Sequence, residues 1–574
     1  MMMNDKRDNI NGLQMLKSKL NYFSSFRTRV IWLVITIFSL GGMIDIPASS
    51  LLPVSTVAAF AIITLIAMFK ATLFIGLLSF TRSLRWLSIA VKTIIVVYCL
   101  LCAINALGYC LFDMGITVKM MTVIGQTNYA EVREFIPGAV NGIMSLLGNP
   151  NTYLLLLAVC VCVGILKIIP DRCYTISVAV CSLAGLIFFI SVFIVLSAGR
   201  TNFSLPLRLF KSGIYAHREM CQIQAELAKV SPLPHRETVE SSCLADIVMV
   251  IGESANRNNL SLYGYPLATT PELDGLNDRI IIFSDVIGSS TLTAYNMNRI
   301  LTFLPDSEPA DLWYKRPMLF PLMKEAGYHT VWLSNQEKSG IWGNATVAMV
   351  STASDIRFVG GTSSDDATLQ KYDGLLLPVL DDVLGSEHNA KFIGVHLMGS
   401  HIEYRRRYPE TFQKFTADSI LKTEIGRKLT NSQAATLAEY NNSLLYTDAL
   451  LARMIEKIAS LSRPVLFIYF SDHGENVYDG GENFCGRDEK HVEVPFIIYP
   501  NPAYIETYPQ NVARLKDVSD TPMTTASICH LICSLTGTAY QAYDPTRDIS
   551  SRDYQIRPRY VDDRVWKYEH VPVQ

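Results

Sequence analysis

The stretch "RPVLFIYFSDHGENVYDGG", residues 463–481, places three ionisable side chains directly after a run of apolar residues. The run 464–470 is typical of a buried strand, and Asp472, His473 and Glu475 follow it. A turn that leaves a strand is often polar simply because it is solvated. In α/β sheets, however, ligands bind at strand ends, where backbone groups and loop side chains converge. The stretch alone allows both interpretations, and the rest of the chain decides between them.

The chain has 574 residues, which is too long for one ordinary domain. Its composition is 49% hydrophobic, and the apolar excess lies almost wholly before residue 200. Five apolar stretches there approach the roughly 20 residues that a helix needs to cross a bilayer. They lie at about 29–47, 52–69, 86–107, 152–169 and 174–197. We therefore predict that residues 1–200 form an α-helical transmembrane domain with five spans.

Charge supports a membrane topology and gives no indication of nucleic-acid binding. The 50 Lys and Arg residues nearly balance the 52 Asp and Glu residues, so no basic surface is expected. The N-terminal tail carries six basic residues up to Arg29, and the second-to-third loop carries Arg82 and Arg85. The first connection, residues 41–50, has none. By the positive-inside rule the N-terminus is cytoplasmic, and five spans place the chain after residue 200 on the other side.

The sequence after residue 200 changes in two steps. Residues 201–242 read as an amphipathic, interfacial helix followed by a linker rich in Pro, Ser and charge. From residue 243 to 574, short apolar runs alternate with helical patterns, which predicts an α/β domain with a mostly parallel central sheet. The expected strands are 246–252, 279–286, 329–334, 391–397, 464–472 and 494–499.

Several of these strands begin or end beside side chains that can bind a metal. Glu253 follows the first strand, His401 follows the fourth, and His491 precedes the last. Because the carboxyl ends of parallel strands meet at one edge, Asp472 and His473 are expected to lie near Glu253. Glu, Asp and His without thiolates suit a zinc ion. Each residue alone is more often solvated or structural, and their repetition at strand ends favours a metal site.

A crowded group of hydroxyls lies in the stretch "DVIGSSTLTAYNMNRILTFL", residues 285–304, where a predicted strand gives way to a helix. A helix N-terminus offers unpaired N–H groups and positive potential, both of which suit a phosphate. Zinc would lower the pKa of a hydroxyl there and make it a nucleophile. Helix capping also favours Ser and Thr at such a position. The predicted metal cluster favours a nucleophilic role for one of these hydroxyls over a role in helix capping alone.

Five stretches together resemble the bacterial phosphoethanolamine transferases, which are membrane members of the alkaline phosphatase/sulfatase superfamily. They are "VIGESANRNNLSLYGYPLATTPELD", "SSTLTAYNMNRILTFL", "GVHLMGSHIEYRRRYP", "YFSDHGENVYD" and "GRDEKHVEVPFIIY". The resemblance covers most of residues 243–574, and the five-span anchor also fits. It implies a bacterial inner-membrane protein with a sulfatase-like catalytic domain in the periplasm.

The resemblance implies that Glu253, Asp472 and His473 bind one zinc ion together with a threonine nucleophile. The pattern T-x-T-A-Y in residues 291–295 favours Thr291 as this nucleophile and metal ligand. The spacing from the later "ILTF" favours Thr293 instead. We expect Thr291 to be the nucleophile. The sequence is compatible with one zinc ion or with two.

The resemblance also implies a substrate site and a reaction. His401 and His491 match positions that bind the substrate phosphate or a second zinc ion, and Asn335 matches a position that contacts phosphoethanolamine. The donor is phosphatidylethanolamine, and the reaction passes through a covalent phospho-threonine. The acceptor is an envelope glycan or lipid, with lipopolysaccharide core, lipid A and periplasmic glucan all open.

Three alternatives stand beside this interpretation. A phosphoglycerol transferase acting on periplasmic glucan would use the same zinc–threonine core. A plain sulfatase is disfavoured because no C-x-P-S-R or S-x-P-S-R sequence occurs to supply a formylglycine. A membrane-anchored sensor or scaffold that has lost catalysis is the non-enzymatic alternative, and it would bind no zinc.

Overall fold

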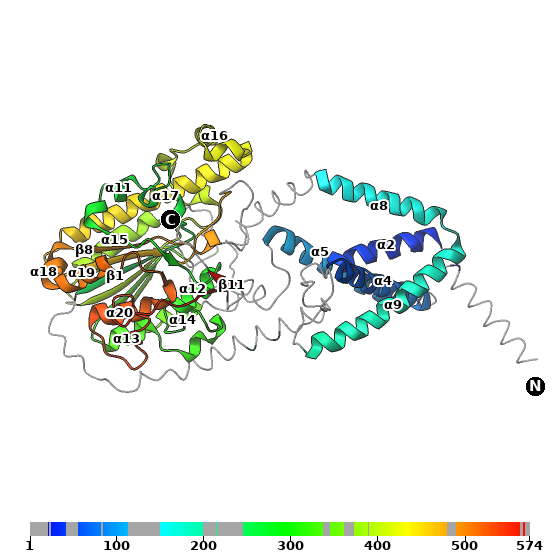
Figure 1. Cartoon of the computed structure of the whole chain (residues 1–574), viewed down its shortest axis with the longest axis horizontal. Coiled ribbons are helices and arrows are strands. Elements are labelled where there is room, and N and C mark those ends of the chain that lie inside the picture. Colours follow the sequence, from blue (N-terminus) through cyan, green and yellow to red (C-terminus); the bar gives the residue numbers. More distant parts are fainter. Residues whose placement is uncertain are drawn as a thin grey trace, which may run out of the picture. The chain divides into compact units, whose positions relative to one another are not determined.

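The computed structural model of the chain describes residues 21, 25–41, 56–81, 84–112, 150–198, 214, 218, 245–336, 345–360, 372–387, 390–478, 489–562 and 566–568. The chain divides into two compact units (Figure 1). One comprises Met1–Thr122 and Pro137–Arg218, and the other comprises Val123–Ile136 and Glu219–Gln574. The predicted interfacial helix and linker at 201–242 lie outside the described residues except for positions 214 and 218. The domain boundaries at 200 and 242 therefore stay predictions.

Helices of the first unit overlap all five apolar stretches predicted from the sequence. They are α2 (Phe26–Gly41), α4 (Thr56–Thr81), α5 (Arg85–Phe112), α8 (Pro150–Ile168) and α9 (Asp171–Ala198). Helix α4 packs against α2, α5 and α9. By length and composition, two segments of the described residues could cross a membrane, Ala61–Thr81 and Arg85–Ala106. Two of the five predicted spans thus meet these criteria, and the other three stay predictions.

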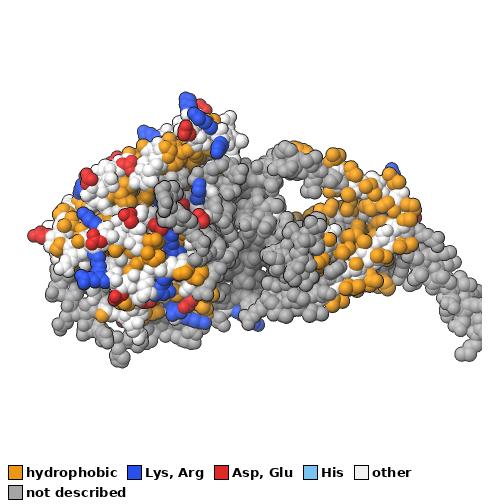
Figure 2. Space-filling model, viewed as in Figure 1, with side chains coloured by type: hydrophobic (Ala, Val, Ile, Leu, Met, Phe, Trp, Pro, Cys, Tyr) orange, Lys and Arg blue, Asp and Glu red, His pale blue; other side chains and the backbone are white. Residues whose placement is uncertain are grey.

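The surface of this unit is rich in large apolar side chains. Figure 2 shows hydrophobic side chains gathered over its helices. Trp86, Leu100, Leu157, Val180 and Leu183 are each more than half exposed. Monomeric soluble proteins rarely expose apolar patches of this extent, whereas lipid tails would cover them without cost. The surface thus supports the prediction of a membrane anchor.

Arg29, one of the basic residues in the predicted cytoplasmic tail, is buried at the ends of two other helices. Its guanidinium donates to the carbonyl oxygens of Leu166 (2.8 Å) and Ile169 (2.6 Å) and pairs with Asp171. It also lies over the ring of Tyr174, 4.6 Å from the centroid. The last carbonyls of a helix have no partner within the helix, so Arg29 satisfies the end of α8 and ties it to α9.

The second unit is built around a seven-stranded sheet in the order β2-β8-β7-β1-β6-β4-β5. The five strands from β7 to β5 run parallel, and β8 is antiparallel to β7 and to β2. This confirms the predicted, mostly parallel sheet. The bounds are β1 (Asp246–Gly252), β2 (Ile281–Ile282), β4 (His329–Ser334), β5 (Asp355–Phe358), β6 (Lys391–His396), β7 (Val465–Ser471) and β8 (Phe496–Pro500).

Helices cover both faces of this sheet, as Figure 1 shows. One face carries α12 (Thr293–Ile300), α13 (Leu319–Glu325), α14 (Ala345–Val350) and α20 (Ile528–Thr536). The other carries α11 (Pro271–Asp274), α15 (Leu376–Gly385) and α17 (Asn431–Ala459), and α16 (Ala417–Leu421) packs on α17. Two further helices, α18 (Pro502–Thr507) and α19 (Pro509–Asp517), follow β8. In β1, Met249 joins the first core and Val248 the second, as the two-residue period of a strand requires.

The predicted strand 279–286 is wrong in one respect, because the chain forms two short strands there. Residues Ile281–Ile282 pair with β8, the amide of Phe283 donates to Phe496 O at 2.9 Å, and after Phe283 the chain leaves the main sheet. The amide of Ser284 then donates to Ser519 O at 3.0 Å, and β3 (Val286–Ile287) pairs with β9 (Met523–Thr524). A small hairpin of β10 (Arg559–Val561) and β11 (Trp566–Tyr568) completes the strands. The sequence did not predict β5, whose residues are only half-buried.

Asp246, the first residue of β1, is expected to be important for stability. Its carboxylate is buried and accepts from the amide of Lys391 (2.9 Å) and from Nε of Arg463 (2.8 Å). The Lys391 ammonium lies 4.0 Å away and is buried as well. Replacing Asp246 with alanine leaves this ammonium buried without its carboxylate, which should lower the free energy of unfolding by about 3–5 kcal/mol.

The measurement is thermal unfolding of the full-length chain in detergent, with Arg357→Ala as the control. Arg357 pairs with Asp355 and Asp382 at the surface, where an ion pair contributes at most about 1 kcal/mol. The melting temperature should therefore fall clearly in Asp246→Ala and hardly at all in the control. Equal shifts in the two variants would contradict a structural role for the buried pair.

Candidate metal centre

Parallel pairing of β1 and β7 brings three ionisable side chains to one edge of the sheet. Gly252 at the end of β1 pairs with Ser471 at the end of β7. The next residues along the two strands are Glu253 on one and Asp472 and His473 on the other. Strand ends in such sheets are where ligands bind. The convergence predicted from the sequence for these three residues is therefore present in the structure.

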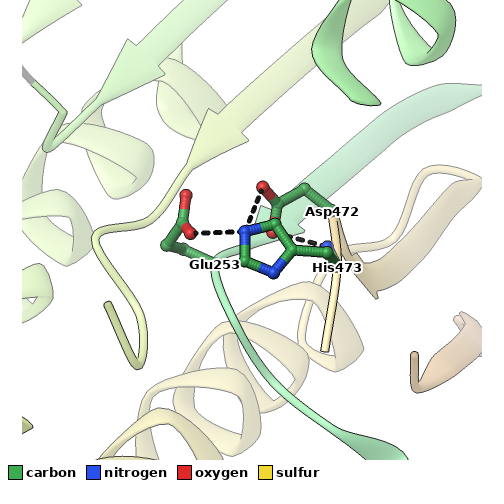
Figure 3. Close-up of side chains that lie close together, drawn as sticks. All are labelled: Glu253, Asp472 and His473. Carbon is green, nitrogen blue, oxygen red and sulfur yellow. Dashed lines mark hydrogen bonds and ion pairs between the residues drawn. The ribbon is translucent and has the colours of Figure 1, made fainter. Parts of the chain in front are cut away.

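The three side chains point toward one another in a buried cluster (Figure 3). One potential ligand atom from each lies within 4.8 Å of the others. Nε2 of His473 is 3.3 Å from Oε1 of Glu253 and 3.6 Å from Oδ2 of Asp472. All three residues are at least nine-tenths buried. Two carboxylates and one imidazole at this spacing are a donor set that suits zinc.

Each side chain is held by one atom and leaves another directed into the cluster. Nδ1 of His473 lies 2.7 Å from the carbonyl oxygen of Gly474. Because a carbonyl only accepts, Nδ1 carries a proton, and Nε2 offers its lone pair to a metal when the ring is neutral. Oδ1 of Asp472 accepts from the amides of Ser254 (3.2 Å) and His473 (2.7 Å). Its Oδ2 is buried and has no hydrogen-bond partner among the described residues.

The pKa values of the cluster indicate that positive charge is favoured at its centre. Burial and the neighbouring charge of Glu253 raise the pKa of Asp472 to about 7. Burial also raises the pKa of Glu253, but the hydrogen bond and charge of His473 outweigh it and lower that pKa to about 2. For His473, burial lowers the pKa, but the carboxylates of Asp472 and Glu253 raise it to about 10. Two buried carboxylates thus stabilise a cation between them.

Ser254 adopts a left-handed backbone conformation beside the cluster, with φ of 57°. This region is uncommon for a residue other than glycine and costs energy, and it tends to occur at functional sites. Here it allows one residue to contact two carboxylates, because the amide donates to Asp472 and the hydroxyl donates to Oε1 of Glu253 at 2.8 Å. The strained residue therefore fixes the orientation of both potential ligands.

A threonine hydroxyl completes the cluster, and it belongs to Thr293. Thr293 is the first residue of α12, and Leu292 before it has an extended backbone. Its Oγ1 lies 3.2 and 3.1 Å from the two carboxylate oxygens of Glu253 and 3.3 Å from Nε2 of His473. Glu253, Thr293, Asp472 and His473 therefore offer four donors, the number that a tetrahedral zinc site requires.

Thr291, the threonine favoured by the sequence pattern, lies in a different environment. Its Oγ1 is 3.2 Å from Oδ2 of Asp562, and its amide is 3.3 Å from Oδ1 of the same residue. The structure thus places Thr293, and not Thr291, at the cluster. The physical reason is that the turn before α12 is anchored on Asp562, so the two hydroxyls have separate partners. Thr293 is therefore the candidate nucleophile.

The structure also places the three residues predicted to bind substrate. His491 is buried, and its Nε2 lies 2.8 Å from Oε1 of Glu475. It reaches this edge because β8 is antiparallel, so that β8 begins where β7 ends. His401 is half-buried and close enough to Glu253 to lower the pKa of that carboxyl. Their contacts with a substrate stay predictions.

Asn335, the third predicted substrate contact, is buried after the end of β4. Its amide nitrogen donates to Oδ1 of Asp373 at 2.7 Å. Asp373 also accepts from the amides of Met398 and Gly399, both at 2.8 Å. Asn335 is thus part of the support for the loop after β6. A contact of its side chain with phosphoethanolamine stays a prediction.

Residues that the sequence did not single out also surround the cluster. Gln336 donates from Nε2 to Oε2 of Glu253 (3.4 Å) and to the carbonyl oxygen of Leu397 (2.9 Å). Its position directly after Asn335 at the end of β4 is the signal that could have found it. Oδ1 of Asn296 accepts hydrogen bonds from the amides of Ser289 and Ser290 and so closes the turn before Thr293. Nothing local in the sequence indicates Asp562.

A comparison with models of known protein families identifies the family of this chain. The family model described as sulfatase matches residues 245–538, just over half of the chain. The chain belongs to the sulfatase family. The alkaline phosphatase/sulfatase superfamily expected from the sequence is thereby confirmed. All four donors of the cluster lie within the matched residues.

Relatives of this sulfatase-family chain include transferases. Phosphoethanolamine transferase EptC of Escherichia coli K12 is 30% identical over 365 residues, covering 61% of this chain and 62% of that protein. A zinc complex of the periplasmic domain of E. coli EptC is similar in structure, with a TM-score of 0.52 and 29% identity, covering 58% of this chain and 92% of that one. The sequence match to the whole EptC protein thus spans less than two thirds of its length.

A structural similarity of low identity extends over most of the chain. The integral membrane protein lipooligosaccharide phosphoethanolamine transferase A from Neisseria meningitidis gives a TM-score of 0.59 at 19% identity. The match covers 90% of this chain and 97% of that one. At this identity the similarity concerns the fold alone.

Proposed function

We propose that the protein is a zinc-dependent phosphoethanolamine transferase of the bacterial inner membrane. It transfers phosphoethanolamine from phosphatidylethanolamine to an envelope acceptor, lipopolysaccharide core or lipid A. The observation that carries the proposal is the hydroxyl of Thr293, which lies within 3.3 Å of both Glu253 and His473. The names of the relatives, which are phosphoethanolamine transferases, support this reaction.

The residues present fit a zinc ion. Glu253, Thr293, Asp472 and His473 would hold it, and the buried Oδ2 of Asp472 is the atom that most clearly needs a cation. When bound, zinc lowers the pKa of a coordinated hydroxyl and offsets the charge of a phosphate. The zinc complex of the E. coli relative supports this choice of metal. One ion is proposed, because the described residues form one such cluster.

The chain's own residues perform the transfer in two steps. In the first, Oγ1 of Thr293 attacks the phosphorus of the donor lipid, the bond from phosphorus to diacylglycerol breaks, and the diacylglycerol oxygen takes up a proton. Glu253 and His473 contact the threonine hydroxyl and hold its oxygen at the cluster, and the proton of the hydroxyl passes to water. In the second, an acceptor hydroxyl or phosphate oxygen attacks the same phosphorus and displaces Thr293, which regains its proton. The phospho-threonine formed between the steps is the covalent intermediate.

His491 and His401 are proposed to bind the phosphate during both steps. His491 is held in place by Glu475, which fixes the direction of its ring. Thr293 opens α12, so the unpaired amides of the first helical turn lie beside the same site and favour an anion. Asn335 is proposed to contact the phosphoethanolamine group from the end of β4.

The proposed localisation follows from the donor. The apolar helices of the first unit would anchor the chain in the inner membrane with the N-terminus in the cytoplasm. The second unit would then be in the periplasm, near the lipid surface that supplies phosphatidylethanolamine. The membrane lipids are thus both the environment of the helices and the source of the substrate.

The test is mass spectrometry of the full-length, zinc-loaded chain incubated with phosphatidylethanolamine in detergent. We expect a phosphoethanolamine adduct on a peptide that contains residue 293, together with released diacylglycerol. Phosphatidylglycerol is the control lipid, and a glycerol-phosphate adduct formed in preference would indicate the phosphoglycerol transferase instead. A chain with neither adduct nor bound zinc would refute the proposal in favour of the scaffold.

A further inference from the structure

The C-terminal hairpin of β10 and β11 lies outside the residues matched by the family model, which end at 538. It nevertheless packs against two of the segments that carry site residues, and Figure 1 shows it beside α12. Val561 and Tyr568 of the hairpin form a buried apolar cluster with Ile287 and Val492. Ile287 ends β3, just before the turn that leads to Thr293, and Val492 follows His491 directly.

Charged groups fasten the hairpin on the same two segments. Arg559 of β10 pairs with Asp285 just before β3, at 2.7 and 3.1 Å. The hydroxyl of Tyr568 in β11 donates to Oε1 of Glu493 at 2.5 Å. Arg257 lies between the two carboxylates, 3.9 Å from Asp285 and 3.4 Å from Glu493. Since these groups are largely buried and each charge has an opposite partner, the hairpin is held in one position.

Asp562, the residue after β10, extends this attachment into the turn before Thr293. It is buried and has a left-handed backbone with φ of 52°, which aspartate tolerates better than most residues. Its amide donates to the carbonyl oxygen of Ser289 at 3.0 Å. Its Oδ1 accepts from Oγ of Ser290 at 2.7 Å, and Thr291 donates to both carboxylate oxygens. One residue thus contacts three successive residues of the turn.

The contacts continue to the residue beside the nucleophile. Oγ of Ser290 donates to Asp562 and accepts from the amide of Leu292 at 3.2 Å. Leu292 precedes Thr293, whose position at the start of α12 is set by the turn. Asn296 of α12 also binds the turn, because its Oδ1 accepts from Ser290 N at 3.0 Å. The direction of Thr293 is therefore determined by two side chains that bind the turn, Asp562 after β10 and Asn296 in α12.

We propose that Asp562 is a positioning residue, through which the C-terminal hairpin holds Thr293 Oγ1 against the carboxylate–histidine cluster. The proposal rests on the proposed function, since it assumes that Thr293 is the group that reacts. Asp562 acts on Thr293 through its hydrogen bonds to Ser290 and Thr291. A displacement of about 1 Å at a reacting atom can lower a rate by about 100-fold.

The first experiment compares Asp562→Ala with Asp548→Ala in the full-length, zinc-loaded chain. Asp548 is a matched control because it is equally buried in the C-terminal segment and accepts from Ser550 and from Tyr543, all at 2.7–2.9 Å. We expect Asp562→Ala to slow adduct formation by about 100-fold, with zinc content unchanged and KM for the lipid within about threefold. Asp548→Ala should react within about threefold of wild type, even where it lowers the melting temperature.

A conservative variant separates positioning from loss of structure. Asp562→Asn keeps one carbonyl oxygen for Ser290 and Thr291, so it should recover about tenfold of the rate lost in Asp562→Ala. If Asp562→Ala does not fold, Thr291→Val decides. It removes only the hydroxyl bond to Asp562 and should slow adduct formation at Thr293 by about tenfold with KM unchanged. A wild-type rate in the variant tested would overturn the proposal.

A second measurement does not depend on the reaction. Hydrogen exchange of peptides covering residues 286–296 should be faster in Asp562→Ala than in wild type and unchanged in Asp548→Ala. Equal exchange in the two variants would overturn the role of the hairpin. A wild-type chain that forms no adduct would instead refute the proposed function, while the exchange result would still decide whether Asp562 holds the turn.

Discussion

Thr293→Ala is expected to lose both the covalent adduct and the transfer of phosphoethanolamine, with a fall in turnover of at least about 10⁴-fold. The reason is that Oγ1 of Thr293 is the hydroxyl in contact with Glu253 and His473. Removing it deletes the atom that would bond to phosphorus, and binding of the lipid cannot replace that atom. The measurement is site mapping of the adduct by tandem mass spectrometry, beside an assay of transfer.

Thr291→Ala is the matched control, since it removes the same side chain two positions away in the same turn. It loses the bond to Asp562 but keeps Thr293, so an adduct should still form, more slowly. Thr293→Ser keeps a hydroxyl at the cluster and should keep a substantial part of the activity, which excludes misfolding as the cause of the loss in Thr293→Ala. An adduct mapped to Thr291, and lost in Thr291→Ala alone, would return the role to the residue favoured by the sequence pattern.

The elements that a sequence predicts well here are the long, continuous apolar runs. The strands predicted at 246–252 and 329–334 have the same bounds as β1 and β4, because both are buried on two faces and carry a continuous apolar run, Ile247–Ile251 in β1 and Val331–Leu333 in β4. The run 279–286 is equally apolar, but its backbone bonds divide between β8 and the segment 519–523. The pairing of two residues with one sheet and two with another is a tertiary choice that no local pattern contains.

The residues of the candidate site also divide into those that the sequence could predict and those that it could not. Glu253, Asp472 and His473 were predictable because each directly follows a strand whose direction in the sheet is set by parallel pairing. The choice between Thr291 and Thr293 was not, because both lie in one turn and either could face the cluster. That choice depends on Asp562, which is 271 residues away in the chain. A contact of this kind leaves no periodicity or motif in a single sequence.

Asp472→Asn is expected to lower zinc affinity by more than about 100-fold and to reduce transfer correspondingly. The change keeps the shape of the side chain but removes its charge. Oδ2 of Asp472 is buried without a hydrogen-bond partner among the described residues and lies 3.6 Å from Nε2 of His473. An amide is a poor zinc ligand, so the cation loses one of its two carboxylates. The measurement is bound zinc in the purified chain by elemental analysis.

The melting temperature of Asp472→Asn provides a second, independent test of the metal site. Without zinc, burial and the charge of Glu253 raise the pKa of Asp472 to about 7, so above that pH the ionised carboxylate of Asp472 opposes folding. Asp472→Asn removes one charge, so the chelator-treated variant should melt at a higher temperature than chelator-treated wild type. With zinc the order should reverse, because wild type gains the binding energy of the ion and the variant gains little. The two melting curves therefore exchange order when zinc is added.

Asp448→Asn is the matched control for this reversal. Asp448 is also buried, but its two oxygens accept from the amides of Glu272 and Leu273, both at 2.9 Å, and it is not part of the cluster. In Asp448→Asn an NH2 group takes the place of one acceptor oxygen and faces a backbone N–H, so one hydrogen bond is lost. The melting temperature should therefore fall by a similar amount with and without zinc. If Asp472→Asn behaved in the same way and retained wild-type zinc, Asp472 would be a structural carboxylate like Asp448. The reversal thus separates a carboxylate that binds the metal from one that binds backbone amides, because only the former gains a new partner when zinc is added.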